Sequence, residues 1–338
     1  MSLAKAEVRR LFKRRLTRIV LILALLVLAA FPVGFFISSQ KASPETRAAA
    51  EVEAQQNFDQ VSRDHNRMIE QCEAEKAGGS TTTEQMYGPN CGKDWAPTRD
   101  QFRAEDYMQY EFNFQEEFPI SLFVFSGILA MAAFLIGASF VGAEWNSGGM
   151  MNLLLWRPRR LPVLATKLLV LLGGILGVAV VFGALWTAAF WSIGKFDGAV
   201  GKLTSGVWQS FALDGVRGVG LILVVAAVGF GLASLGRHTA MALGAATGVF
   251  VISEIGLRIA LPLVQVPFPD RFYLSTWAGA WFGKEMTIYN YRECDFAQGV
   301  CNPGEMLLTW QDAGLVFGIG AVVVLGLAFW TMRRRDIT

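Results

Sequence analysis

The sequence predicts an all-α integral membrane protein with six transmembrane helices and with both termini in the cytoplasm. Hydrophobic residues make up 53% of the 338 residues and charged residues only 17%, whereas soluble domains carry about 25% charged residues. The chain also contains apolar runs of the roughly 17–25 residues that a helix needs to cross a bilayer. We place these runs at 19–37, 118–141, 161–191, 218–235, 240–264 and 313–332.

The segregation of charge between the apolar runs predicts the topology. Lys and Arg favour the cytoplasmic side of short loops. Residues 1–18, the segments that follow the second and fourth runs, and the C-terminal end together hold 15 Lys and Arg and only three acids. Residues 39–118 instead hold 16 Asp and Glu against 8 Lys and Arg. An even number of spans with both termini inside satisfies both distributions.

Residues 1–18 predict a cytoplasmic amphipathic elbow helix that leads into the first transmembrane helix at 19–38. Apolar residues of this stretch can share one side, with cations around them, so the helix is expected in the membrane interface. It either fixes the orientation of the first span or also contacts a cytoplasmic partner. The apolar core of the first span has 19 residues, longer than the ~7–15 of a signal peptide, so we expect it to stay uncleaved. The candidate elbow residues are Glu7, Arg10, Lys13 and Arg14.

Residues 39–118 predict a helical extracytoplasmic domain between the first two spans. Pro44 and Glu45 suit a helix start, and the stretch from Pro44 to Lys76 is rich in Ala, Glu, Gln and Arg. The Gly/Ser/Thr-rich stretch 77–90 is typical of a loop. No catalytic constellation is visible, and the acids of this domain favour a solvated surface over a metal site.

The four cysteines fall only in segments predicted to lie outside. Outside compartments permit disulfides, so we predict the bridges Cys72–Cys91 and Cys294–Cys301 among the three connectivities that four cysteines allow. A zinc site is the alternative, but these segments contain only His65 and no CxxC spacing. We therefore expect no metal in this chain.

The segment around 265–308 predicts an outer re-entrant element and a disulfide-closed loop before the last span. Its aromatic residues suit a membrane interface, and the stretch 274–282 predicts a short helix that dips into the outer leaflet. Within the preceding span, Glu254 and Arg258 have the i, i+4 spacing that places them on one helix face. Intramembrane charges face protein or water, so this pair either fixes helix packing or belongs to a transport pathway.

Three GxxxG patterns occur in the spans, at 173–177, 244–248 and 314–318. Small residues allow close helix approach in lipid, and we expect these glycines to serve packing within the bundle, with a dimer contact as the alternative.

The sequence lacks the motifs of an enzyme. The stretch 277–287 contains a Gly-Lys pair, but Ala278 and Glu285 stand where a P-loop requires Gly and Ser/Thr. HExxH and GxSxG motifs are missing, and the chain has two histidines. We expect no catalytic residue, no cofactor and no nucleic-acid partner for this chain.

The stretch AEWNSGGMMNLLLWRPRRLPVLATKLLV, from Ala143 to Val170, resembles the first cytoplasmic loop of type-2 ABC transporter permeases. The family pattern is an acid, a small-residue turn, an apolar patch, a Pro/Arg turn and a Lys that opens the next helix. Glu144, Ser147–Gly149, Met150–Trp156, Arg157–Arg160 and Lys167 supply it. The six-helix topology, the elbow helix and the re-entrant element match the family too, while the 80-residue insertion at 39–118 departs from it.

This resemblance implies a coupling helix at about 143–161 that docks on a separate ATPase subunit. Met and Leu would form an adaptable apolar contact, and the acid and arginines would form orienting ion pairs at its rim. The residues implied in ATPase coupling are Glu144, Gly148, Gly149, Met150, Met151, Leu154, Leu155, Arg157, Arg159 and Arg160.

The resemblance further implies the permease subunit of an ABC exporter in a bacterial plasma membrane. The expected partners are two ATPase copies that bind ATP and Mg, a second permease copy or a paralogue, and membrane lipids. The substrate is expected to be a lipid, drug, peptide or similar amphipathic molecule. A membrane sensor or accessory protein with 39–118 as receiving domain is the alternative, and a lipid-modifying membrane enzyme is a third. The sensor requires a cytoplasmic output domain and the enzyme a polar catalytic cluster, and neither is recognisable in the sequence.

Overall fold

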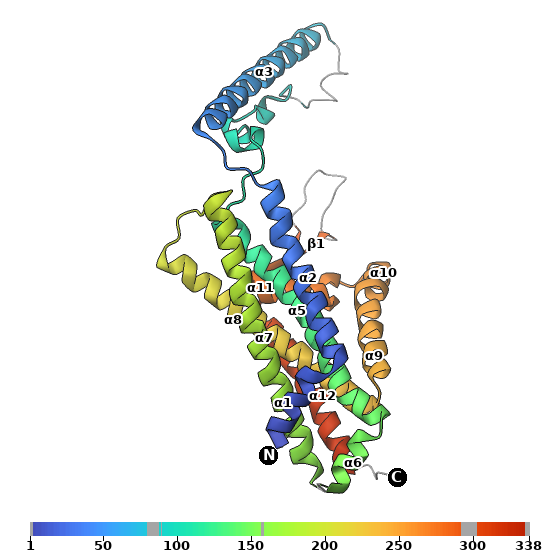
Figure 1. Ribbon diagram of the computed structural model, residues 1–338. Coiled ribbons are helices and arrows are strands. Elements are labelled where there is room, and N and C mark those ends of the chain that lie inside the picture. Colours follow the sequence, from blue (N-terminus) through green and yellow to red (C-terminus); the bar gives the residue numbers. More distant parts are fainter. Residues whose placement is uncertain (1–2, 80–87, 89, 157–158, 292–302, 335–338) are drawn as a thin grey trace. The chain divides into compact units, whose positions relative to one another are not determined.

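The computed structural model describes residues 3–79, 88, 90–156, 159–291 and 303–334, and it is built almost entirely of helices (Figure 1). Among these residues, six helical segments are long and apolar enough to cross a membrane. Each overlaps one of the six predicted spans. They are α2 (Arg15–Ser38), α5 (Phe114–Asn146), α7 (Arg160–Phe196), α8 (Ser205–Gly236), the segment Thr239–Leu263, and α12 (Trp310–Arg334).

The chain divides into two compact units, which we describe separately. The first comprises Met1–Pro32, Gln115–Phe190 and Lys202–Thr338, and it contains most of the apolar helices. The second comprises Val33–Phe114 and Trp191–Gly201.

Helices α5 and α8 approach each other closely in the first unit. A Cβ added at Gly137 of α5 would lie 2.4 Å from the carbonyl oxygen of Ala226, and one at Gly229 of α8 would lie 2.6 Å from that of Phe134. Only glycine permits backbones to approach this closely, which is how helices associate in lipid. The predicted role of the GxxxG patterns is wrong for Gly173, Gly177, Gly244, Gly248 and Gly318, because an added Cβ there would meet nothing within 4 Å.

The N-terminal helix α1 (Leu3–Lys13) is separated from α2 by Arg14 alone, and it packs on α7. Leu11 is buried, and its Cδ2 lies 2.7 Å from where a Cβ of Gly174 would be. The apolar side expected from the sequence is only partly buried within the chain, because Val8, Phe12 and Leu16 remain exposed.

The fifth span is not a regular α-helix. It consists of α9 (Thr239–Val251), a π-helical turn at Ile252–Gly256 and α10 (Leu257–Leu263). A π-turn inserts one residue into the helical repeat and often marks a functional position. The predicted charged residue Glu254 lies inside this turn.

A short helix and a hairpin connect the fifth span to the last. The 3₁₀ turn η5 (Pro269–Phe272) precedes α11 (Leu274–Gly283), which covers the predicted short helix. The strands β1 (Glu285–Asn290) and β2 (Gly304–Thr309) then pair antiparallel, from Glu285 opposite Thr309 to Asn290 opposite Gly304. This sheet is an addition to the expected all-helical fold, and it packs through Ile288 and Leu308 against α11 and α12. The predicted Cys294–Cys301 bridge lies outside the described residues.

The second unit is built on one long helix, α3 (Pro44–Ala77), as predicted from 44–76. The Ser43 side chain caps its first turn by accepting a hydrogen bond from the Thr46 amide, at 3.1 Å. The predicted Cys72–Cys91 disulfide is present, so this pair does not form the alternative zinc site. The segment after Cys91 forms the 3₁₀ turns η1 (Lys93–Trp95), η2 (Arg99–Gln101) and η3 (Ala104–Tyr107).

Several helices extend beyond the predicted apolar runs, and two of these extensions bear on the site. The fourth span begins at Ser205 rather than near Gly218, and α5 continues to Asn146 rather than ending near Val141. In both cases the helix continues past its most apolar stretch, because the backbone hydrogen bonding of a helix tolerates polar residues that can pair with neighbours. The second extension places Glu144 inside a helix.

Candidate functional site

The turn between α5 and α6 positions the candidate coupling helix. Gly148 has a φ of 70°, in the left-handed region that glycine adopts without strain. This residue ends the extension of α5, and the eight-residue helix α6 (Gly149–Trp156) starts immediately after it. The small residues of the motif therefore allow the chain to change direction between the two helices.

The two faces of α6 differ in exposure. Met150 and Leu154, spaced i, i+4, are buried within the chain. Met151, Leu155 and Trp156 lie on the exposed side, with Leu155 81% and Trp156 87% exposed. Large apolar side chains in such positions commonly mark a protein or membrane contact.

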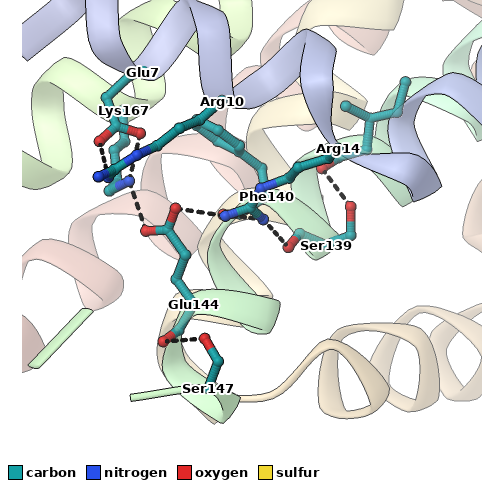
Figure 2. Close-up of polar contacts among 9 residues, drawn as sticks. Glu7, Arg10, Arg14, Ser139, Phe140, Glu144, Ser147 and Lys167 are labelled. Atoms are coloured by element: carbon teal, nitrogen blue, oxygen red, sulfur yellow. Dashed lines mark hydrogen bonds and ion pairs between the residues drawn. The ribbon is translucent and has the colours of Figure 1, made fainter. Parts of the chain in front are cut away.

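A network of buried and partly buried ion pairs fixes the C-terminal end of α5, directly before α6 (Figure 2). Glu144 in the last turn of α5 accepts a hydrogen bond from the Arg14 guanidinium at 2.5 Å, and its other oxygen lies 2.6 Å from Nζ of Lys167. Arg14 also donates to the backbone carbonyls of Ser139 and Phe140, both at 3.0 Å. One acid thus joins the end of α5 to the α1–α2 junction and to α7.

Lys167 is the centre of the network. Its Nζ lies 2.7 Å from Oε2 of Glu7 on α1, and both side chains are fully buried. Glu7 also accepts a hydrogen bond from Arg10 at 3.0 Å. Arg14 and Lys167 both lie over the Phe140 ring, at 5.2 and 5.1 Å from its centroid. Buried charges require such partners, because an unpaired charge in this environment is costly.

A second contact holds the end of α5 from another direction. A Cβ at Gly142 would lie 2.5 Å from Oγ1 of Thr239, at the start of α9. The guanidinium of Arg237, in the turn between α8 and α9, lies 4.9 Å from the Trp145 ring centroid. The C-terminal end of α5 is therefore packed against the α8–α9 turn as well as against α1 and α7.

The structure corrects the role expected for part of the motif. Glu144 was predicted to form ion pairs at the rim of a partner interface, but it is buried and its carboxylate pairs with Arg14 and Lys167. Met150 and Leu154 were predicted to contact a partner, yet both face the interior. The physical reason is that α5 continues to Asn146 and places Glu144 beside α1 and α7, while α6 starts after the turn at Gly148 with Met150 and Leu154 on its buried face.

The remaining predicted residues differ in how accessible they are to a partner. Gly149 follows the turn and is half-buried, Arg159 is exposed, and Arg160 is half-buried. Arg157 lies outside the described residues. Lys13 is exposed at the end of α1.

Glu254 and Arg258 form the predicted pair, at 3.3 Å, and Glu254 has further partners. The Ser275 amide and hydroxyl donate to its carboxylate at 2.8 and 2.7 Å. Arg258 also lies 4.7 Å from the Tyr273 ring centroid. The pair thus connects the π-turn of the fifth span to α11, in agreement with a packing role, while the exposed Arg258 leaves the pathway role open.

Sequence reasoning missed two features. It read Lys167 only as part of the loop pattern, although a lysine two turns inside an apolar span signals a buried acidic partner. It also missed an ion pair at 2.8 Å between Asp214 and Arg217, because the fourth span was started four residues after Asp214. Within the described part of the chain, no cluster of three His, Cys, Asp or Glu side chains could hold a metal.

Comparison with known proteins adds one finding. Residues 1–275 match a family model described as ABC-2 family transporter protein. A search of curated proteins finds no match.

Proposed function

The chain belongs to the ABC-2 family of transporter membrane proteins, and from this premise we propose that it is the permease subunit of an ATP-driven exporter. In this proposal, separate ATPase subunits bind ATP and Mg, dock on α6, and drive movement of the membrane helices. The complex contains two ATPase copies and two permeases in a bacterial plasma membrane. The exported substrate is amphipathic.

The observation that carries this proposal is the unequal exposure of α6. Met151, Leu155 and Trp156 form an apolar face at the tip of the first loop, whereas Met150 and Leu154 attach the same helix to the chain. A contact that includes an exposed Trp beside Leu and Met suits the centre of a protein interface, where aromatic residues dominate the binding energy.

The network beneath α6 supports transmission of movement. Coupling between two sites requires an element whose position both sites bias. The end of α5 qualifies because Glu144 joins it to Arg14 and Lys167, and Gly142 joins it to the α8–α9 turn. A displacement of α6 is therefore transmitted to α1, α5, α7 and α8 together.

The second permease copy is proposed to contact the fifth span. Gly244 and Gly248 face open space in this chain, and small residues at this spacing allow a helix from another copy to approach closely. Cross-linking between protomers through cysteines placed at these two positions tests this arrangement.

Purification of the chain from its native membranes tests the docking site. An ATPase subunit should co-purify with the wild-type protein and be lost from the Trp156→Glu and Leu155→Glu variants, because a charge in an apolar contact costs several kcal/mol. The matched control is Trp95→Glu, which changes a 67% exposed Trp in the other unit. Retention of the ATPase by both α6 variants would refute α6 as the docking element.

A further inference from the structure

A cavity of about 590 Å³ lies between α5, α7 and α8 in the first unit. Each helix contributes residues from one face: Phe118–Ser126 on α5, Leu176–Thr187 on α7 and Trp208–Val219 on α8. Because α6 follows the C-terminal end of α5 and precedes α7, this cavity belongs to the half of the spans away from α6.

The chemistry of the lining restricts what can bind. Only two of the lining side chains, Ser126 and Thr187, carry a hydroxyl, and Trp208 carries the only other polar atom. Ser126 donates to the Leu122 carbonyl at 2.7 Å and Thr187 to the Gly183 carbonyl at 2.8 Å. Both hydroxyl groups therefore donate to backbone carbonyls of their own helices. A molecule bound in the cavity would contact mainly hydrocarbon.

Small residues create the space, and packing within the chain does not use it. Gly215 of α8 lines the cavity, and a Cβ added there would meet nothing within 4 Å. A Cβ added at Gly183 of α7 would make only ordinary contact with Phe125, at 3.7 Å. These glycines differ from Gly137 and Gly229, where a backbone fills the space.

The length of the cavity matches one leaflet of a bilayer. From Trp208 to Val219, α8 rises about 16 Å at about 1.5 Å per residue, and half of a hydrocarbon core is about 15 Å. Trp208 lies in the first turn of α8, at the end where Trp favours the membrane interface. The cavity is therefore about as long as one leaflet of the hydrocarbon core is thick, and Trp208 lines one of its ends.

The volume of the cavity suits the binding of one slender apolar chain. The cavity has about 590 Å³, which falls within the range of about 300–1,000 Å³ for small-ligand sites. We propose that this cavity is a binding site for one acyl chain of a membrane lipid in the leaflet opposite α6.

Photolabelling tests the proposal on the full chain in nanodiscs, with a phosphatidylcholine that carries a diazirine near the middle of one acyl chain. Labelled peptides should be concentrated on residues 118–126, 176–187 and 208–219. Gly215→Leu should reduce this labelling at least threefold, because the new side chain fills the cavity. The control Gly320→Leu places the same side chain in open space on α12 and should leave labelling unchanged.

Three outcomes would overturn the acyl-chain site. One is even labelling of all exposed spans, another is labelling that Gly215→Leu does not change, and the third is a protomer–protomer cross-link through a cysteine at position 215. The last outcome would identify a second copy as the occupant. The test requires no ATPase, so its result is independent of the docking experiment at α6.

Discussion

Lys167 and Glu7 form an ion pair in which Nζ and Oε2 are 2.7 Å apart and neither side chain is exposed. They are 160 residues apart in sequence and join α1 to α7. A buried pair of this kind contributes less to net stability than its geometry suggests, because both charges lose hydration. The pair instead fixes the position of α1, since α1 cannot separate from α7 without exposing or unpairing a charge.

Replacement of Lys167 by Met should destabilise the protein strongly. The change leaves Glu7 and Glu144 without the ammonium between them, and loss of one partner of a buried pair costs about 3–5 kcal/mol. Thermal unfolding of the purified protein measures the effect. Lys13→Met, on the exposed side of α1, is the matched control. Equal unfolding temperatures for the two variants would contradict the buried network.

The Lys167→Met/Glu7→Gln double variant should be less destabilised than the sum of the single variants. The second change removes one of the two carboxylates that the first leaves unpaired, and neighbours in one network are not additive. A double-mutant cycle of the unfolding free energies gives the coupling. Additive effects would show that the two residues act separately.

Arg14→Gln and Glu144→Gln should each weaken coupling while leaving the ATPase bound. Both changes remove one charge of the 2.5 Å ion pair between the α1–α2 junction and α5 but leave the exposed face of α6 intact. We expect transport per ATP hydrolysed to fall about fivefold or more, the usual range of a coupling energy between sites. Arg15→Gln, an exposed neighbour, should behave as wild type. If all three variants transport equally, Arg14 and Glu144 have no part in coupling.

Gly137→Ala should destabilise the protein, whereas Gly127→Ala on the same helix should not. The added methyl at 137 meets the Ala226 carbonyl at 2.4 Å, but at 127 it meets nothing within 4 Å. Overpacking costs about 1–3 kcal/mol, while Gly→Ala at an open helix position gains up to about 1 kcal/mol. Unfolding temperatures of the two variants should therefore shift in opposite directions, and a shift in the same direction would contradict the close α5–α8 contact.

Cys72 and Cys91 should resist alkylation until a reductant is added, because they form a disulfide. Tryptic peptides that contain the two residues should migrate as one linked species before reduction and as two afterwards. The same map tests the predicted Cys294–Cys301 bridge, which would leave no cysteine open to alkylation without reductant. Reduction of the first bridge should cost about 3 kcal/mol, as its 19-residue separation implies.

Several elements could be predicted from the sequence because their causes are local. The apolar runs predicted all six spans, and Pro44 with the Ala- and Glu-rich stretch predicted α3. The glycines around 148 predicted the turn before α6. Each of these depends on hydrophobicity, helix capping or backbone freedom within a few residues.

Tertiary structure decided what those elements do, because distant contacts assign the roles. The sequence predicts that Glu144 contacts a partner subunit. In the structure it instead forms ion pairs within the chain, with Arg14 and Lys167 on other helical segments. Of the six glycines in the GxxxG patterns, only Gly314 packs closely within the described chain, against Trp281, whereas Gly137 and Gly229, outside these patterns, make close backbone contacts. Sequence by itself determined which segments enter the membrane, since apolar surface must leave water. Which faces of those segments meet one another, and which stay open for a partner or a lipid, depends on packing that no local pattern encodes.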